Sequence, residues 1–241
     1  MRNYFLKNKF LWLTFGVALI VLFYFYHTVL LAPNDFLFSA EGDGIKNYYT
    51  YLYHAQYGTQ FGHFSGMNYP YYEHVVYTDA HPLFSYLIGQ LGLANYGVGI
   101  LNVLMLLSYP IAAVFIFKIF RHYKVNDWWA LAAAVAITFL SPQIFRLTGH
   151  FAMSYVFAVP IMWWLLIKSY STKKWIWSVI ISLYMLAFFF THPYLGIILA
   201  FFSIVFWLVN MVKSRKEILP GIARILIQTA LPLVLFQGYI S

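Results

Sequence analysis

Long runs of apolar residues alternate with short polar segments along most of the chain. Because a helix needs about 20 apolar residues to cross the hydrocarbon core of a bilayer, windows of that length predict membrane-spanning helices. They lie near residues 10–31, 97–120, 128–145, 151–170, 175–191, 193–212 and 222–240. A shorter apolar segment, 83–93, is expected either to be interfacial or re-entrant, or to begin a long, tilted second span. The pattern predicts an all-α, polytopic transmembrane bundle of about seven spans, with 1–241 as a single domain.

The composition supports this fold class. Hydrophobic residues make up 62% of the chain and charged residues 9%, and the mean hydropathy is +0.71. A soluble domain carries about 25% charged residues, so the lipid bilayer is the expected surrounding. The chain has no cysteine, which excludes disulfides and thiolate metal sites.

The basic residues indicate how the bundle is oriented. All of the 15 Lys and Arg residues except Lys46 and Arg146 fall on one side of the predicted spans, beginning with Arg2 and Lys7. Short loops rich in Lys and Arg stay in the cytoplasm, so we expect a cytoplasmic N-terminus and an extracytoplasmic loop over 32–82. The net charge of +8 is then a signal for topology, and no nucleic-acid partner is expected.

The outer loop, 32–82, concentrates the polar chemistry of the chain. It holds five of the seven acidic residues and four of the eight histidines, and loops of this length are usually functional. Within it, apolar side chains recur at helical spacing: Ile45, Tyr48, Tyr49, Leu52 and Tyr53. The opposite face is expected to carry Lys46, Asn47, Thr50 and His54. This pattern predicts an amphipathic helix along the outer membrane surface.

Glu41 and Asp43 stand at the start of that helix and have two readings. A carboxylate there can cap free backbone N–H groups, with the other acid simply solvated. The alternative is a catalytic pair, because a second acidic segment, "YTDAHPLFSYL", returns to the membrane at the far end of the loop. The Pro-, Gly- and Tyr-rich stretch 66–82 between them favours a shaped pocket. Rings such as Tyr69 are expected either to stack on sugars or to lie at the interface as tyrosines commonly do.

The stretches "EGDGIKNYYTY", "MNYPYYEHVVYTDAHPL" and "RLTGHF", in this order after a first span, resemble a bacterial branch of the GT-C superfamily of polytopic membrane glycosyltransferases. The resemblance implies an inverting transfer of sugar from a polyprenyl-phosphate donor to a glycan, lipid or protein acceptor. It implies a general base in the first outer loop, at Asp43 or, as second choice, Glu41. It places the protein in the bacterial inner membrane. Family members have more spans and often a soluble C-terminal domain, so this chain is expected to be an N-terminal membrane part.

Several further residues are candidates for binding such a donor. Arg146 and His150 lie in the second outer loop, where Arg suits a phosphate through its planar fork or else snorkels to lipid headgroups. Lys46 is the other outer cation, and His192 lies in a short turn on the same side. Asp79 and His81 form an Asp-x-His pair that suits a hard cation. Asp43 and Asp79 are therefore candidate ligands for Mg²⁺ or Mn²⁺.

Two other functions are compatible with the same polar loop: a transporter or flippase of lipid-linked glycans, and a non-catalytic membrane assembly subunit. Ionisable residues within the membrane mark ion pathways and proton relays. The spans predicted here carry very few of them, which counts against a proton-coupled transporter.

Overall fold

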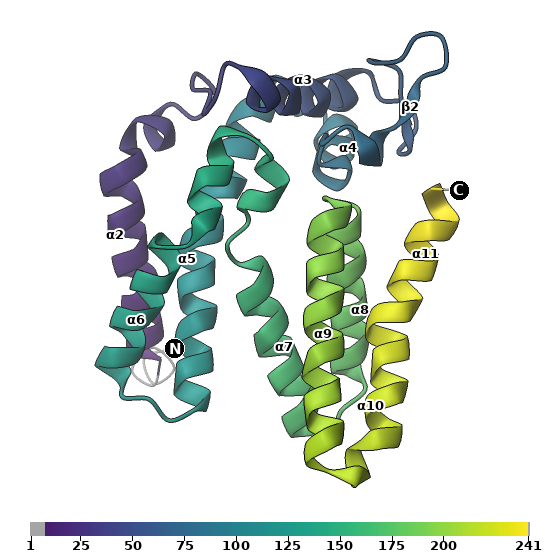
Figure 1. Cartoon of the computed structure of the whole chain (residues 1–241). Coiled ribbons are helices and arrows are strands. Elements are labelled where there is room, and N and C mark those ends of the chain that lie inside the picture. Colours follow the sequence, from purple (N-terminus) through teal and green to yellow (C-terminus); the bar gives the residue numbers. More distant parts are fainter. Residues whose placement is uncertain (1–7, 241) are drawn as a thin grey trace. The chain divides into compact units, whose positions relative to one another are not determined.

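The computed structural model describes residues 8–240, so Arg2 and Lys7 lie outside the described residues. Its helices and its one pair of short strands are shown in Figure 1. The α-helices are α2 (Lys9–Leu31), α3 (Gly42–Tyr57), α4 (Pro82–Gln90), α5 (Gly97–His122), α6 (Asp127–Phe139), α7 (Ala158–Thr172), α8 (Ile176–Phe189), α9 (Pro193–Lys213), α10 (Ile218–Ile225) and α11 (Leu231–Ile240). The strands β1 (His63–Phe64) and β2 (Glu73–His74) pair antiparallel, with His63 opposite His74.

Five helical segments of the described chain are long and apolar enough to cross a membrane: Lys9–Leu31, Ala94–His122, Asp127–Thr148, Pro193–Lys213 and Arg215–Ile240. The chain is therefore an all-α integral membrane protein, which confirms the predicted class. The two remaining predicted spans contain α7 and α8, with 15 and 14 residues. A helix rises about 1.5 Å per residue, so these reach about 21–23 Å, less than the roughly 30 Å of a hydrocarbon core. The total of seven spans therefore stays a prediction.

The apolar segment 83–93 does not begin the second span. Helix α4 ends at Gln90, and Gly92 takes a positive φ of 69°, a conformation that glycine adopts without steric cost. A short 3₁₀ turn, η2 (Ala94–Tyr96), then leads into α5. Of the two alternatives, the short separate element is the one observed.

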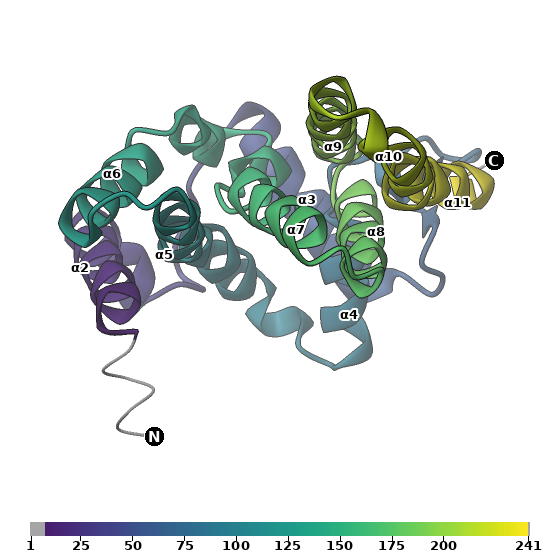
Figure 2. The ribbon, with the colours of Figure 1, turned by 90° about the horizontal axis from the view of Figure 1, so that it is seen from below.

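The contacts divide the chain into two compact units. The first unit contains residues up to 46 and 95–164. In it α2, α5 and α6 pack against one another, as both Figure 1 and Figure 2 show. Asn102 on α5 donates from Nδ2 to the backbone carbonyls of Pro33 (2.8 Å) and Phe36 (2.7 Å). This polar side chain fastens the segment after α2 to α5.

The second unit contains residues 47–94 and those from 165 onward, and here α8, α9, α10 and α11 pack together (Figure 2). Gln228 lies in the single π-helical turn η6 (Leu226–Ala230) between α10 and α11. Its Oε1 accepts from Nε1 of Trp207 at 2.8 Å, and its Nε2 donates to Oγ of Ser178 at 2.9 Å. One amide side chain thus joins the π turn to α8 and α9.

Helix α3 confirms the predicted element but not the predicted face. The side chains expected to face water are buried, with exposed fractions of 0%, 0% and 1% for Asn47, Thr50 and His54. Ile45 and Tyr49, expected on the apolar face that lies along the membrane, are 41% and 46% exposed. The reason is α4, which packs on the polar side: Nδ1 of His54 lies 2.7 Å from Oγ of Ser85. Burial of a polar group is tolerated when it is hydrogen-bonded.

Candidate functional site

Asp43 lies in the first turn of α3, and glycines determine how that turn packs. Gly42 takes a φ of 51° directly before it, which glycine allows. At Gly44, an added Cβ would lie 2.3 Å from Cβ of Ser39 and 3.1 Å from the backbone oxygen of Thr148. Only a residue without a side chain fits so close to both. The start of α3 is thereby held against the end of η3 (Pro142–Thr148).

This packing brings His150 beside Asp43 within the first unit. Nε2 of His150 lies 3.4 Å from Oδ2 of Asp43, and Nζ of Lys46 lies 3.8 Å from Oδ1. The three side chains, called the Asp43 cluster below, come from one turn of α3 and from the residue after Gly149. The Asp43 side chain is 52% exposed. Ion pairs this exposed add little to stability, but here they place two nitrogen atoms within 4 Å of a carboxylate that remains accessible to solvent.

Two predicted residues of the same unit lie near this region without joining the cluster. Glu41 is exposed, and Oγ of Ser39 donates to its backbone oxygen at 3.1 Å. Arg146 is exposed on η3, and its backbone oxygen accepts from the N–H of Gly149 at 3.2 Å. Within residues 8–240, neither side chain forms an ion pair. The surroundings of Asp43 and Glu41, which are alternatives from the sequence alone, therefore differ: Asp43 has ion-pair partners and Glu41 is an exposed side chain.

A second pair of predicted residues meets in the second unit. Asp79 precedes α4 and His192 precedes α9, and Nε2 of His192 lies 2.8 Å from Oδ1 of Asp79. Nδ1 of His192 accepts from the N–H of Tyr194 at 3.3 Å, which leaves the ring proton on Nε2 as the donor to the carboxylate. Their side chains are 8% and 15% exposed. Such a charge-assisted bond is short and strong, and it fixes the segment before α4 to the turn before α9.

His81 follows this pair and is completely buried, with a φ of 47°. Desolvation and, to a smaller extent, the nearby His192 lower the pKa of His81 while the carboxylate of Asp79 raises it, and together they bring this pKa to about 3. The imidazole is therefore neutral at physiological pH. It lies inside the second unit and not at a surface where a donor phosphate would bind.

The aromatic stretch of the loop 32–82 lines a groove of about 500 Å³ in the second unit, between the β1–β2 pair and the end of α11. Tyr69 is 84% exposed and lies outside the groove lining. The lining instead includes Tyr72, Glu73, His63 and His74. Glu73, His63 and His74 are not among the predicted site residues, although Glu73 is one of only seven acidic residues in the chain.

The metal site stays a prediction. Among residues 8–240, no group of three or more His, Asp or Glu side chains is arranged to hold a metal ion. Asp43 and Asp79 belong to different compact units. The chemistry that the structure itself supports at the Asp43 cluster is that of a carboxylate with two cationic or polar neighbours.

Comparisons with known proteins give one match. A family model described as "Domain of unknown function (DUF6311)" matches residues 14–240, so the chain belongs to this family. No curated protein and no solved structure matches the chain.

Proposed function

We propose that this member of the DUF6311 family is a membrane glycosyltransferase of the GT-C type. It moves a sugar from a polyprenyl-phosphate donor to an acceptor at the extracytoplasmic membrane face, with Asp43 as general base. The observation that carries the proposal is the Asp43 cluster: a half-exposed carboxylate on the first turn of a helix, with His150 at 3.4 Å and Lys46 at 3.8 Å.

The reaction assigns a role to the carboxylate. The acceptor hydroxyl oxygen attacks the anomeric carbon, and the bond from that carbon to the phosphate oxygen breaks, so the lipid phosphate leaves with the electron pair. Asp43 takes the hydroxyl proton as the new bond forms, and attack from the side opposite the phosphate inverts the anomeric centre. A general base must come within about 3 Å of the hydroxyl oxygen whose proton it removes. The 52% exposed side chain of Asp43 is accessible to such a hydroxyl.

The neighbouring residues suit the charge of the donor. Lys46 and His150 lie within 4 Å of the Asp43 carboxylate, where they can also donate hydrogen bonds to a departing phosphate. Arg146 is exposed on the adjoining turn η3, and an Arg fork meets phosphate oxygens bidentately. Glu41 has no part in this scheme, because among residues 8–240 its carboxylate forms no ion pair like those of Asp43.

The proposal includes the full topology: seven spans, a cytoplasmic N-terminus, residues 32–82 outside and a bacterial inner membrane. The orientation is supported by the Lys and Arg residues, which fall on one side of the predicted spans with two exceptions.

The chain has no cysteine, so a single introduced cysteine is the one site that a maleimide can label. In intact cells, a membrane-impermeant maleimide is expected to label Tyr71→Cys, at a position that is 91% exposed, and not Tyr123→Cys, at a position that is 59% exposed. The reverse result would contradict the orientation.

The function is tested by sugar transfer in proteoliposomes, using a panel of radiolabelled polyprenyl-phosphate sugars. Loss of a general base costs about 10²–10⁴-fold in rate, so we expect the rate of sugar transfer by Asp43→Asn to be at least a hundredfold below that of wild type. Glu41→Gln is the matched control, two residues away with the same change of charge, and is expected to stay within about threefold of wild type, since Glu41 has no role in the scheme. EDTA in a parallel series tests the predicted Mg²⁺ or Mn²⁺.

Two outcomes would contradict the proposal. One is a folded wild-type protein that transfers no sugar from any donor of the panel. The other is an Asp43→Asn protein as active as wild type. Movement of a labelled lipid-linked glycan across the vesicle membrane without transfer would favour the transporter instead.

A further inference from the structure

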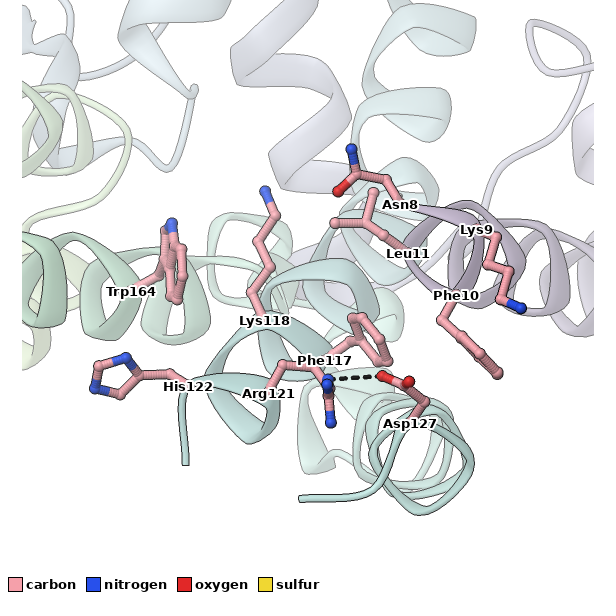
Figure 3. Close-up of a pocket in the computed structure, with 10 residues that line it drawn as sticks. All are labelled: Asn8, Lys9, Phe10, Leu11, Phe117, Lys118, Arg121, His122, Asp127 and Trp164. Carbon is pink, nitrogen blue, oxygen red and sulfur yellow. Dashed lines mark ion pairs between the residues drawn. The ribbon is translucent and has the colours of Figure 1, made fainter. Parts of the chain in front are cut away.

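A pocket of about 450 Å³ opens in the first unit where α2 begins, α5 ends and α6 begins. Figure 3 shows its lining, which includes Lys9, Phe117, Lys118, Arg121, Asp127 and Trp164. Helix α2 runs from this pocket toward the start of α3, and α6 runs from it toward η3. The pocket therefore lies at the opposite end of this unit from the Asp43 cluster.

The lining carries an excess of positive charge. Three cations, Lys9, Lys118 and Arg121, share the pocket with one carboxylate, Asp127. Nε of Arg121 lies 2.6 Å from Oδ1 of Asp127, the ion pair drawn in Figure 3. That pair accounts for the carboxylate and for one cation, so the two lysines add a net positive charge to the site.

Aromatic rings lie beside both lysines of the lining. Nζ of Lys118 lies 4.5 Å from the ring centroid of Phe115 and 6.0 Å from that of Trp164. Nζ of Lys9 lies 5.4 Å from the ring centroid of Phe10. An aromatic face attracts a cation through its quadrupole but carries no net charge of its own. A ligand with a negative charge is therefore favoured.

The position and the apolar part of the lining indicate the kind of anion. Three candidate spans begin or end at the pocket, so it lies at the level of lipid headgroups. Phe10, Leu11 and Phe117 line it together with the charges, and a free phosphate would gain nothing from them. Basic pockets between transmembrane helices bind anionic headgroups, and Trp is enriched at this level of the bilayer.

We infer that this pocket binds the headgroup of an anionic phospholipid, with Lys9 and Lys118 contacting the phosphate. The inference is independent of the proposed function, because the pocket lies at the end of the unit opposite the Asp43 cluster. The bound headgroup fills a charged hollow between α2 and α5.

The test is native mass spectrometry of the full chain in detergent, titrated with phosphatidylglycerol or with phosphatidylcholine. We expect one phosphatidylglycerol to bind tightly and phosphatidylcholine to bind at least tenfold more weakly. Lys9→Gln/Lys118→Gln is expected to weaken phosphatidylglycerol binding by about 30-fold, from the usual contribution of two lysines near an anionic lipid. Lys9→Arg/Lys118→Arg keeps the charges and is expected to keep the binding.

The matched control is Lys213→Gln/Lys216→Gln, which removes two exposed charges, one at the end of α9 and one in the turn that follows it, both outside the pocket. An equal loss of binding in both Gln double variants would overturn the inference in favour of a general charge effect. Equal binding of phosphatidylcholine would also overturn it. Displacement of the lipid by glycerol phosphate at matched concentration would assign the pocket to free phosphate compounds instead.

Discussion

His192 and Asp79 lie 113 residues apart in the chain, yet Nε2 of the first is 2.8 Å from Oδ1 of the second. His192 is the N-cap of α9, and Asp79 lies three residues before the first residue of α4. A backbone bond from the N–H of Leu83 to the oxygen of Phe190, at 3.3 Å, runs beside this pair. The end of the loop 32–82 is thus fastened to the α8–α9 turn by one charge-assisted and one backbone hydrogen bond.

Asp79 is expected to contribute to stability through its backbone conformation and through the bond of its carboxylate to His192. The backbone of Asp79 has a φ of 60°, a conformation that Asn and Asp adopt more readily than most other residues. Asp79→Asn keeps that backbone and an acceptor for His192, so we expect a loss of about 1 kcal/mol in the free energy of unfolding. Asp79→Leu leaves the buried imidazole N–H without its partner and is expected to cost about 3 kcal/mol. Unfolding titrations in SDS measure both.

The control for this comparison is Glu73→Gln. Oε2 of Glu73 accepts from Nδ2 of Asn68 at 3.0 Å in an exposed position, where such contacts contribute roughly 0–1 kcal/mol. If Asp79→Leu destabilises no more than Glu73→Gln, the buried pair does not contribute as argued.

The stability of the protein is expected to fall in acid because of His81. Desolvation holds the pKa of His81 at about 3, below its ordinary value of 6.5. Below pH 6.5 the unfolded chain gains a proton on this ring that the folded protein does not, so the free energy of unfolding decreases as the pH falls. Between pH 7.5 and 5.5 the loss from this one group is about 1.4 kcal/mol.

His81→Asn isolates that contribution, because Asn tolerates the φ of 47° at this position. The difference between the stabilities at pH 7.5 and 5.5 is expected to shrink in the variant, as measured by SDS titration at both pH values. An unchanged difference would mean that other groups account for the pH dependence.

Gln228 and Trp207 are expected to be energetically coupled. Trp207 is completely buried, and its Nε1–H donates to Oε1 of Gln228 at 2.8 Å. Gln228→Leu leaves that N–H in apolar surroundings, whereas Trp207→Phe removes it. A double-mutant cycle is therefore expected to give a coupling of about 1 kcal/mol, within the range of hydrogen bonds between membrane helices. Additive losses would show that the bond contributes nothing net.

Hydropathy predicted the long helices because their apolar residues are continuous over 20 positions, as in α2 and α5. It did not indicate where the helix begins in the window 151–170, which is apolar throughout although its α-helix starts only at Ala158. His150 takes a φ of 58°, and the 3₁₀ turn η4 (Phe151–Ser154) precedes α7. A hydropathy window reports composition and contains no information on such backbone reversals.

The candidate site was predicted in part. Asp43, Lys46 and His150 were each singled out from residue type and from their position outside the spans, and the structure brings them into one cluster. The buried face of α3 was not predictable from periodicity, since Ser85, on a helix distant in the sequence, provides the partner that lets His54 be buried. The basic pocket also escaped notice, because its lining comes from four separate segments of the chain.

The approach of α3 to the turn between η3 and η4 can be tested without any assay of function. A Cβ added at Gly149 would lie 3.6 Å from Cβ of Asp43, inside the 3.5–4.5 Å that disulfides span. The φ of Gly149 is 171°, an extended conformation open to any residue. In this cysteine-free chain, Asp43→Cys/Gly149→Cys is therefore expected to cross-link nearly completely under mild oxidation, as measured by protection from a maleimide mass tag. Ile45→Cys/Gly149→Cys is the control, because residue 45 lies about 200° around the helix from residue 43. Equal cross-linking of both pairs, or none of the first, would contradict the packing that places His150 beside Asp43.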